Sequence, residues 1–251
     1  MGVDPGFLRI PPDVFCAQLE VLLDSGFQFV TVAELAELAD GRRPPPGRIA
    51  LSFDDGMDDN YEVVLPILQE YGLTATFYVA TGLIGKPNPW MAPDSGIRMM
   101  TVSELEALVA EGFEIGAHTV THPDLSQLDI ESCLHEVRES RRMLEEALGV
   151  RVRTFAYPFC HYGPAAVSAV AAAGFEAAVT CGTGAGTWDR YELPRTIVTG
   201  KDGMPIFLLK LAGFHGAISG SPPGRAARAL SRRYRDRRRR RIEERRSLDF
   251  G

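Results

Sequence analysis

The chain has 251 residues, of which 45% are hydrophobic and 24% are charged, and its formal net charge is −6. A chain of this length and apolar content can bury one full core, as a single α/β domain does. No apolar run approaches the roughly 20 residues that span a bilayer, and no basic start precedes an apolar stretch at the N-terminus. The sequence therefore excludes a transmembrane segment and shows no signal peptide.

The net charge hides an asymmetry between the body of the chain and its C-terminal end. Residues 225–251 hold 12 Arg and four acidic residues, whereas residues 1–224 hold 15 basic and 29 acidic ones. We therefore divide the chain into a domain over residues 1–218 and a linker with an Arg-rich tail over residues 219–251. Such a tail can contact an anionic polymer or a membrane surface, although a solvated tail is the commoner outcome for this composition.

Hydrophobic periodicity predicts helices and strands in alternation along the body of the chain. The predicted helices cover residues 13–25, 32–38, 63–70, 102–111, 130–148 and 165–173, and Thr101 with Glu104 forms a capping box for the fourth. The predicted strands cover residues 27–30, 48–53, 74–80, 113–117, 154–159, 177–180 and 194–198. This alternation predicts an α/β fold with a mostly parallel sheet.

The four cysteines are far apart in the sequence, at positions Cys16, Cys133, Cys160 and Cys181. No C-x-x-C pair occurs among them. We therefore expect neither a structural zinc site nor a disulfide framework.

Polar side chains follow two of the predicted strands. Asp54 and Asp55 directly follow the strand at 48–53. His118 directly follows the strand at 113–117, and His122 lies four residues further on. Two His and one carboxylate can bind a catalytic divalent metal and leave positions open for water and substrate. The second carboxylate is then free to act as a base. Taken alone, an Asp-Asp-Gly turn is more often a solvated strand end, and two His at this spacing indicate a metal only weakly.

Three segments resemble motifs of the polysaccharide deacetylases with NodB homology, carbohydrate esterase family four, and two of the motifs stand in the correct order and spacing. Ser52–Gly56 resembles T/S-F-D-D-G, His118–Pro123 resembles H-S/T-x-x-H-P, and Phe155–Phe159 resembles the F-A-Y-P-F/Y form of the exopolysaccharide and poly-N-acetylglucosamine branch. The resemblance covers roughly residues 10–215. It implies a distorted (β/α) barrel of about seven strands.

The resemblance implies a role for each residue of the first two motifs. Asp55, His118 and His122 are expected to bind a divalent metal, most often Zn²⁺, with Co²⁺, Ni²⁺ or Fe²⁺ as alternatives. Asp54 is expected to be the general base that takes a proton from the attacking water.

The third motif is expected to form the substrate side of the site. The resemblance implies that the backbone N–H of Phe159 helps to hold the oxyanion and that Tyr157 with Phe159 shapes the sugar site. Ala156 stands where the family usually has an Arg that orients the base. Arg195, in Leu193–Arg195, is a candidate for that role, and a surface Arg is the alternative reading.

The proton donor for the leaving amine is the least evident part of the expected site. In the poly-N-acetylglucosamine branch a His in an N-terminal Y-H-x-V strand takes this role, yet no His precedes His118. We hypothesise that the chain lacks this first strand of the fold together with its acid. His161 and His215 are the remaining candidates, and His161 is the better placed, although a surface or capping His is the commoner outcome at such positions.

The resemblance and the residues together predict an enzyme, a metal-dependent hydrolase that removes N-acetyl groups from an N-acetylhexosamine polysaccharide or glycan. Another carbon–nitrogen hydrolase on the same fold is one alternative. A protein that binds metal and glycan but turns over poorly, because the acid is missing, is the other. Relatives usually work outside the membrane, but nothing in the chain directs its export.

Overall fold

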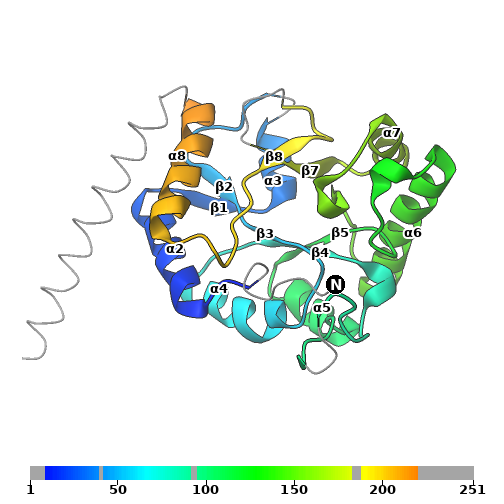
Figure 1. Ribbon diagram of the computed structural model, residues 1–251, viewed down its shortest axis with the longest axis horizontal. Helices are drawn as coiled ribbons and strands as arrows, with labels where there is room; N and C mark the ends of the chain where they lie inside the picture. Colours follow the sequence, from blue (N-terminus) through cyan, green and yellow to red (C-terminus); the bar gives the residue numbers. More distant parts are fainter. Residues whose placement is uncertain (1–8, 40–41, 92–94, 183–187, 220–251) are drawn as a thin grey trace, which may run out of the picture.

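The computed structural model describes residues 9–39, 42–91, 95–182 and 188–219, with the side chains of the last helix described up to residue 213 (Figure 1). The linker and Arg-rich tail lie outside these residues, apart from Ser219. Within the described part, none of the helices combines the length and the apolar character needed to cross a membrane.

The described strands are all parallel to their neighbours. They are β1 (Gln28–Val30), β2 (Arg48–Ala50), β3 (Ser52–Phe53), β4 (Thr76–Val79), β5 (Glu114–Ala117), β6 (Thr154–Ala156), β7 (Ala177–Cys181) and β8 (Leu193–Arg195). Strands β3 to β8 pair in sequence order to form a curled six-stranded sheet, and β1 pairs with β2. Only Leu51 separates β2 from β3, so this segment is the single strand that the sequence predicts at 48–53. The expected barrel-like α/β fold is confirmed.

Helices cover the outside of this curled sheet (Figure 1). They are α2 (Pro12–Asp24), α3 (Val32–Ala39), α4 (Leu65–Tyr71), α5 (Val102–Ala110), α6 (Ile130–Leu148), α7 (Pro164–Ala172) and α8 (Met204–Ser219). A π-helical turn, η1 (Asn60–Val64), leads into α4, and three short 3₁₀ turns, η2 (Thr81–Leu83), η3 (Leu125–Gln127) and η4 (Pro158–Cys160), follow strand ends or precede helices.

Local signals in the sequence explain where several helices begin and end. The capping box at α5 is present, because the Thr101 hydroxyl accepts the Glu104 N–H and the Glu104 carboxylate accepts the Thr101 N–H. At α6, the Asp129 side chain accepts the Ser132 N–H, and Gly149 ends the helix in the left-handed conformation at φ 66°.

Alternation along the strands separates two apolar regions. On β4, Phe77 and Val79 point outward into the core beneath the surrounding helices, whereas Tyr78 joins an inner cluster with Val32 and Trp188. A third cluster packs α8 against α2, through Phe207, Leu211 and other side chains. The structure thus places one face of each central strand inside the curl of the sheet.

A partly buried carboxylate ties the inside of the sheet to a helix. Glu114, at the start of β5, accepts hydrogen bonds from the hydroxyls of Thr76 and Thr154, each at 2.7 Å. It also accepts the Ala33 N–H at 3.0 Å, in the first turn of α3. A negative charge is favourable at a helix N-terminus. Glu114 therefore fixes three neighbouring strands and α3 in one arrangement.

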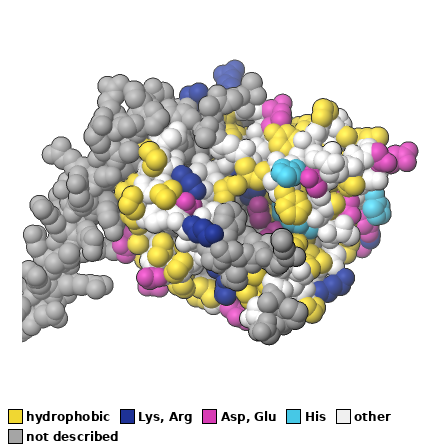
Figure 2. Space-filling model, in the orientation of Figure 1, with side chains coloured by type: hydrophobic (Ala, Val, Ile, Leu, Met, Phe, Trp, Pro, Cys, Tyr) yellow, Lys and Arg dark blue, Asp and Glu magenta, His cyan; other side chains and the backbone are white. Residues whose placement is uncertain are grey.

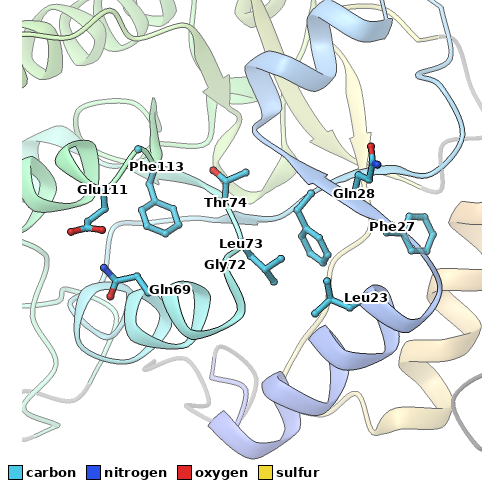
Figure 3. Close-up of a pocket in the computed structure, with 11 residues that line it drawn as sticks. Leu23, Phe27, Gln28, Gln69, Gly72, Leu73, Thr74, Glu111 and Phe113 are labelled. Atoms are coloured by element: carbon cyan, nitrogen blue, oxygen red, sulfur yellow. The ribbon is translucent and has the colours of Figure 1, made fainter. Parts of the chain in front are cut away.

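A hollow of about 670 Å³ lies at the N-terminal ends of β1, β4 and β5 (Figure 3). Leucine and phenylalanine side chains, among them Leu23, Phe27 and Phe113, form much of its lining, with Gln28, Gln69 and Glu111 among its polar side chains. None of the candidate site residues lines this hollow. Because those residues follow the C-terminal ends of their strands, the hollow and the candidate site lie at opposite ends of the sheet.

Candidate functional site

The candidate site is built where β3 and β5 end. Asp54 and Asp55 directly follow β3, and His118 directly follows β5. Since β4 pairs in parallel with both strands, the loops that follow them open on the same rim of the sheet. On this face, acidic and histidine side chains gather near the centre of the molecule (Figure 2).

Asp55, His118 and His122 converge as the sequence predicts. One potential ligand atom from each residue lies within 4.8 Å of the other two. The Asp55 Oδ1 atom is 3.5 Å from His118 Nε2 and 3.3 Å from His122 Nε2, and the two Nε2 atoms are 3.2 Å apart. Two imidazole nitrogens and one carboxylate oxygen form a donor set that suits Zn²⁺ and leaves coordination positions open.

A backbone carbonyl fixes the tautomer of His118. Its Nδ1 atom lies 2.7 Å from the carbonyl oxygen of Ala156, the last residue of β6. A carbonyl can only accept, so Nδ1 carries the hydrogen and Nε2 turns its lone pair toward Asp55 and His122. A ligand histidine typically donates its other N–H to a carbonyl or carboxylate in this way. The residues present therefore fit a divalent metal.

The electrostatics of the three residues also favour a cation. Burial raises the pKa of Asp55, but His118 and His122, which donate to its carboxylate when their Nε2 atoms are protonated, outweigh it and hold the pKa well below its usual range. Burial lowers the pKa of His118, but Asp55 and Asp54 outweigh it and raise the pKa above its usual value. The group is therefore stable when positive charge lies among its acceptor atoms, whether a proton or a metal supplies that charge.

Backbone strain is concentrated in the loops that form the site. Among the described residues, those other than glycine with positive φ are Asp55, Thr119, His122, Phe159 and Cys160, with φ between 56° and 75°. The left-handed conformation costs a residue with a Cβ atom roughly 1–2 kcal/mol. All five residues lie in or directly beside the three motifs. Such strain persists only where the surrounding structure holds it, and it is typical of functional sites.

Arg195 lies against Asp54. Its Nη1 and Nη2 atoms donate to the two carboxylate oxygens of Asp54 at 2.6 and 2.8 Å, and Nη1 also donates to the Ser52 hydroxyl at 3.0 Å. The guanidinium lies over the ring of Tyr78, 5.6 Å from its centroid, and the side chain is only 16% exposed. Burial raises the pKa of Asp54, but Arg195 outweighs it and lowers the pKa, so the carboxylate stays ionised.

Aromatic rings surround His122. The rings of Phe159 and Trp90 lie 4.6 and 4.7 Å from the His122 ring, each in an edge-to-face arrangement. Phe159 is 54% exposed although it is a large apolar residue. Sequence reasoning did not assign Trp90 a role, because the loop that contains it carries no recognisable motif. Asn88 holds that loop, since its side-chain oxygen accepts the N–H of Trp90 at 2.8 Å.

Tyr157 lies deeper than Phe159. Its side chain is fully buried, its hydroxyl donates to the Tyr191 carbonyl at 3.0 Å, and its ring stacks on Tyr162. A bound sugar therefore cannot touch the Tyr157 ring in this structure. Any influence of Tyr157 on the shape of the site acts through packing beneath the third motif.

His161 forms a pair with Asp124 at the edge of the site. The His161 Nδ1 atom is 2.9 Å from an Asp124 carboxylate oxygen, and the side chain of His161 is 60% exposed. Its ring centroid lies 6.1 Å from that of Phe159. His215 belongs to α8, where its side chain lies outside the described residues. Of the two acid candidates, His161 is the one that the structure brings beside the third motif.

The expectation that the cysteines form no disulfide is wrong for one pair. Cys160 and Cys181 are disulfide-bonded with their Cα atoms 5.5 Å apart, whereas Cys16 and Cys133 are free. The two bonded cysteines are 21 residues apart in sequence. They meet because β6 and β7 are parallel neighbours, so their C-terminal ends lie side by side. The bond ties the third-motif loop to β7.

A comparison with family models gives a match to polysaccharide deacetylase over residues 41–178. Among individual proteins, the chain is 27% identical over 195 residues to YxkH of Bacillus subtilis (strain 168), covering 76% of this chain and 66% of YxkH. It is 23% identical over 217 residues to the poly-beta-1,6-N-acetyl-D-glucosamine N-deacetylase of Staphylococcus aureus (strain MRSA252), covering 80% and 71% of the two chains.

Among solved structures, the fold is similar to the Streptococcus pyogenes deacetylase PplD in complex with acetate. The TM-score is 0.69 at 25% identity, and the match covers 84% of this chain and 93% of PplD. The chain spans less than two thirds of the length of several curated relatives, including 66% of YxkH and 4% of a gellan lyase from a Bacillus species.

Proposed function

The chain belongs to the polysaccharide deacetylase family, and from this membership we propose that it is a metal-dependent hydrolase that removes N-acetyl groups from an N-acetylhexosamine polysaccharide or glycan. One observation carries the proposal: Asp55, His118 and His122 converge next to an ionised Asp54 that Arg195 orients. Removal of an acetyl group from an amide needs a polarised carbonyl, an activated water, and a proton for the departing amine. The site offers a group for each task.

Asp55, His118 and His122 are the residues that would hold the metal, through Oδ1 and the two Nε2 atoms. A divalent cation there would act as a Lewis acid toward the acetamide carbonyl and would lower the pKa of a water. The Ala156 carbonyl keeps the His118 ring in the tautomer that this task requires.

Asp54 would take the proton from the attacking water. Its two oxygens each accept from Arg195, which leaves one further lone pair on each oxygen for the water. The lowered pKa keeps Asp54 in the ionised form that a base must have before it acts. The two parallel hydrogen bonds also fix the carboxylate plane, so the water meets a base of defined orientation.

The third motif would bind the acetyl group and the sugar. Phe159 has the left-handed conformation, which bends the turn after β6 sharply. We assign the backbone N–H of Phe159 as a donor to the oxyanion that forms during attack. The exposed ring of Phe159 and the ring of Trp90, which flank His122, offer apolar faces to the C–H groups of a sugar.

His161 would donate the proton to the leaving amine. The Asp124 carboxylate lies at Nδ1 and would hold the hydrogen of that nitrogen, so Nε2 is the atom left to carry the transferable proton. The exposure of His161 allows it to regain a proton from solvent between turnovers.

Acetate release from N-acetylglucosamine oligomers by metal-loaded protein tests the proposed function. We expect release that stops with a chelator and with Asp54→Asn, while Asp59→Asn, a neighbouring carboxylate paired with Arg9, keeps full activity. His161→Ala is expected to lower kcat by about 10²- to 10⁴-fold, as loss of a general acid does. If Asp54→Asn released acetate at the rate of the unchanged protein, the assignment of the base would be wrong.

The same experiment separates the alternatives. Binding of oligomers and metal with no acetate release would favour a glycan-binding protein with impaired turnover. Release of acetate or another acid from small amides, but from no N-acetylhexosamine oligomer, would favour a different carbon–nitrogen hydrolase on this fold.

A further inference from the structure

The loop that joins the two candidate ligand histidines has an unfavourable backbone. Thr119 has φ 67° and His122 has φ 60°, so two of its residues with Cβ atoms adopt the left-handed conformation. Each costs roughly 1–2 kcal/mol. One hydrogen bond within the loop, from the His122 N–H to the Thr119 hydroxyl oxygen at 3.0 Å, supports this conformation. Contacts from outside the loop supply the rest of its support and help to set where His122 lies relative to His118.

Glu136 supplies the contacts on one side of the loop. Its Oε2 atom accepts the backbone N–H groups of Val120 and Thr121 at 2.8 and 2.9 Å, and its Oε1 atom accepts the Thr121 hydroxyl at 2.7 Å. Glu136 belongs to α6, which packs beside β5 and η2 (Figure 1). One carboxylate on a long helix thus binds two consecutive N–H groups between the histidines.

The opposite side of the loop rests on η2. The Thr81 and Gly82 N–H groups donate to the Thr119 and Val120 carbonyls at 3.0 and 2.9 Å. A Cβ atom on Gly82 would lie 2.7 Å from the Val120 carbonyl oxygen, so the approach is as close as glycine permits. The loop is therefore clamped between η2 and Glu136.

We propose that Glu136 is a positioning residue that holds the loop between His118 and His122 in its strained conformation and so preorganises the metal site. This inference rests on the metal binding proposed above. A ligand set must be held within about 0.5 Å of its productive geometry by the residues around it. Loss of such an outer partner typically weakens metal affinity 10- to 100-fold.

Three substitutions separate the reach of the Glu136 side chain from its charge. Glu136→Gln keeps an oxygen that can accept both N–H groups but removes the charge. Glu136→Asp keeps the charge but is one methylene shorter and cannot reach both N–H groups from α6. Glu136→Ala removes both. If Glu136 acts by positioning, Gln should retain most of the affinity and Asp should resemble Ala, whereas a purely electrostatic role predicts the reverse order.

Glu145 provides the matched control. It lies nine residues further along the same helix and also accepts a backbone N–H, that of Val152, at 3.0 Å, together with Arg141 Nε. It is outside the candidate site. Glu145→Ala should therefore lower the thermal stability of the metal-free protein while leaving its metal affinity unchanged.

The experiment measures Zn²⁺ affinity by competition with a chromophoric chelator, together with the Tm of each metal-free variant. We expect Glu136→Ala and Glu136→Asp to weaken Zn²⁺ binding 10- to 100-fold and Glu136→Gln to weaken it much less. Equal affinity in Glu136→Asp and the unchanged protein would overturn the inference, even if Glu136→Ala failed to fold. Absence of Zn²⁺ binding by the unchanged protein would overturn the proposed metal site and this inference with it, whereas normal binding without acetate release would count only against the proposed function.

Discussion

Replacement of Arg195 tests how the candidate base is oriented. Arg195 makes two hydrogen bonds to Asp54, and each hydrogen bond to a charged group contributes about 1.5–3 kcal/mol. If one such bond stabilises the transition state, its loss raises the activation free energy by about this amount and lowers kcat/KM about 10- to 150-fold. We therefore expect Arg195→Ala to lower kcat/KM for acetate release by at least tenfold, with most of the fall in kcat because substrate binding does not need the base.

Arg195→Lys distinguishes orientation from charge. Lysine keeps a positive charge near Asp54 but cannot donate to both carboxylate oxygens in one plane. We expect Arg195→Lys to lose most of the activity that Arg195→Ala loses, although it should be the more stable of the two. Zn²⁺ affinity should change little in either variant, because Arg195 contacts Asp54 and none of the three candidate metal ligands.

The control is an ion pair elsewhere in the fold. Arg153 donates to Glu176 at 2.9 and 2.7 Å through Nε and Nη2, on the side of the sheet away from the site. Arg153→Ala should cost stability and leave kcat/KM intact. If Arg195→Ala folded, bound Zn²⁺ and kept kcat/KM within threefold of the unchanged protein, Arg195 would be a structural residue and the reasoning would fail.

Two further predictions concern stability. Hydrogen bonds with Arg98 lower the pKa of Glu104 from 4.5 to about 2. This pair therefore stabilises the fold above about pH 4.5, and its contribution is lost as the pH falls toward 2. Glu104→Gln should flatten the dependence of Tm on pH in that range. The Cys160–Cys181 bond closes a loop across 21 residues, which corresponds to about 3 kcal/mol of stability from chain entropy. Urea unfolding should show that dithiothreitol lowers the free energy of unfolding by this amount. The Cys160→Ser/Cys181→Ser variant should show no such effect of dithiothreitol, whereas Cys133→Ser should show the full effect.

The convergence of the three candidate metal ligands could be predicted because each lies at or near a strand end, whereas the choice of Asp55 over Asp54 as a ligand came from the resemblance. Parallel strands place their C-terminal ends on one rim, so Asp55 and His118 had to come close once their strands were recognised. The partnership of Arg195 with Asp54 could be suggested only through the resemblance, because the two residues are 141 positions apart and nothing in the spacing links them.

Other features left no readable signal. Helix α8 was missed because it is apolar on all sides near its start, with exposed Ile206 and Leu209 beside buried Phe207, so no helical period stands out. The disulfide was missed because strand pairing, not sequence distance, brings its cysteines together. Glu136 resembles any solvent-facing glutamate on an amphipathic helix until the loop that it binds is seen.

The distribution of strain offers support for the site that is independent of the motifs. A fold stabilised only by packing has no reason to place its left-handed residues other than glycine together, yet those in the described part all lie in or beside three loops that meet at one rim. Glycine at these positions would relieve roughly 1–2 kcal/mol per residue. Asp55, His122 and Phe159 are instead side chains that the proposed chemistry needs. The unfavourable backbone therefore lies where the geometry of candidate ligands, loops and substrate has to be fixed together. Glu136, Arg195 and the Cys160–Cys181 bond are among the contacts that hold these loops in place.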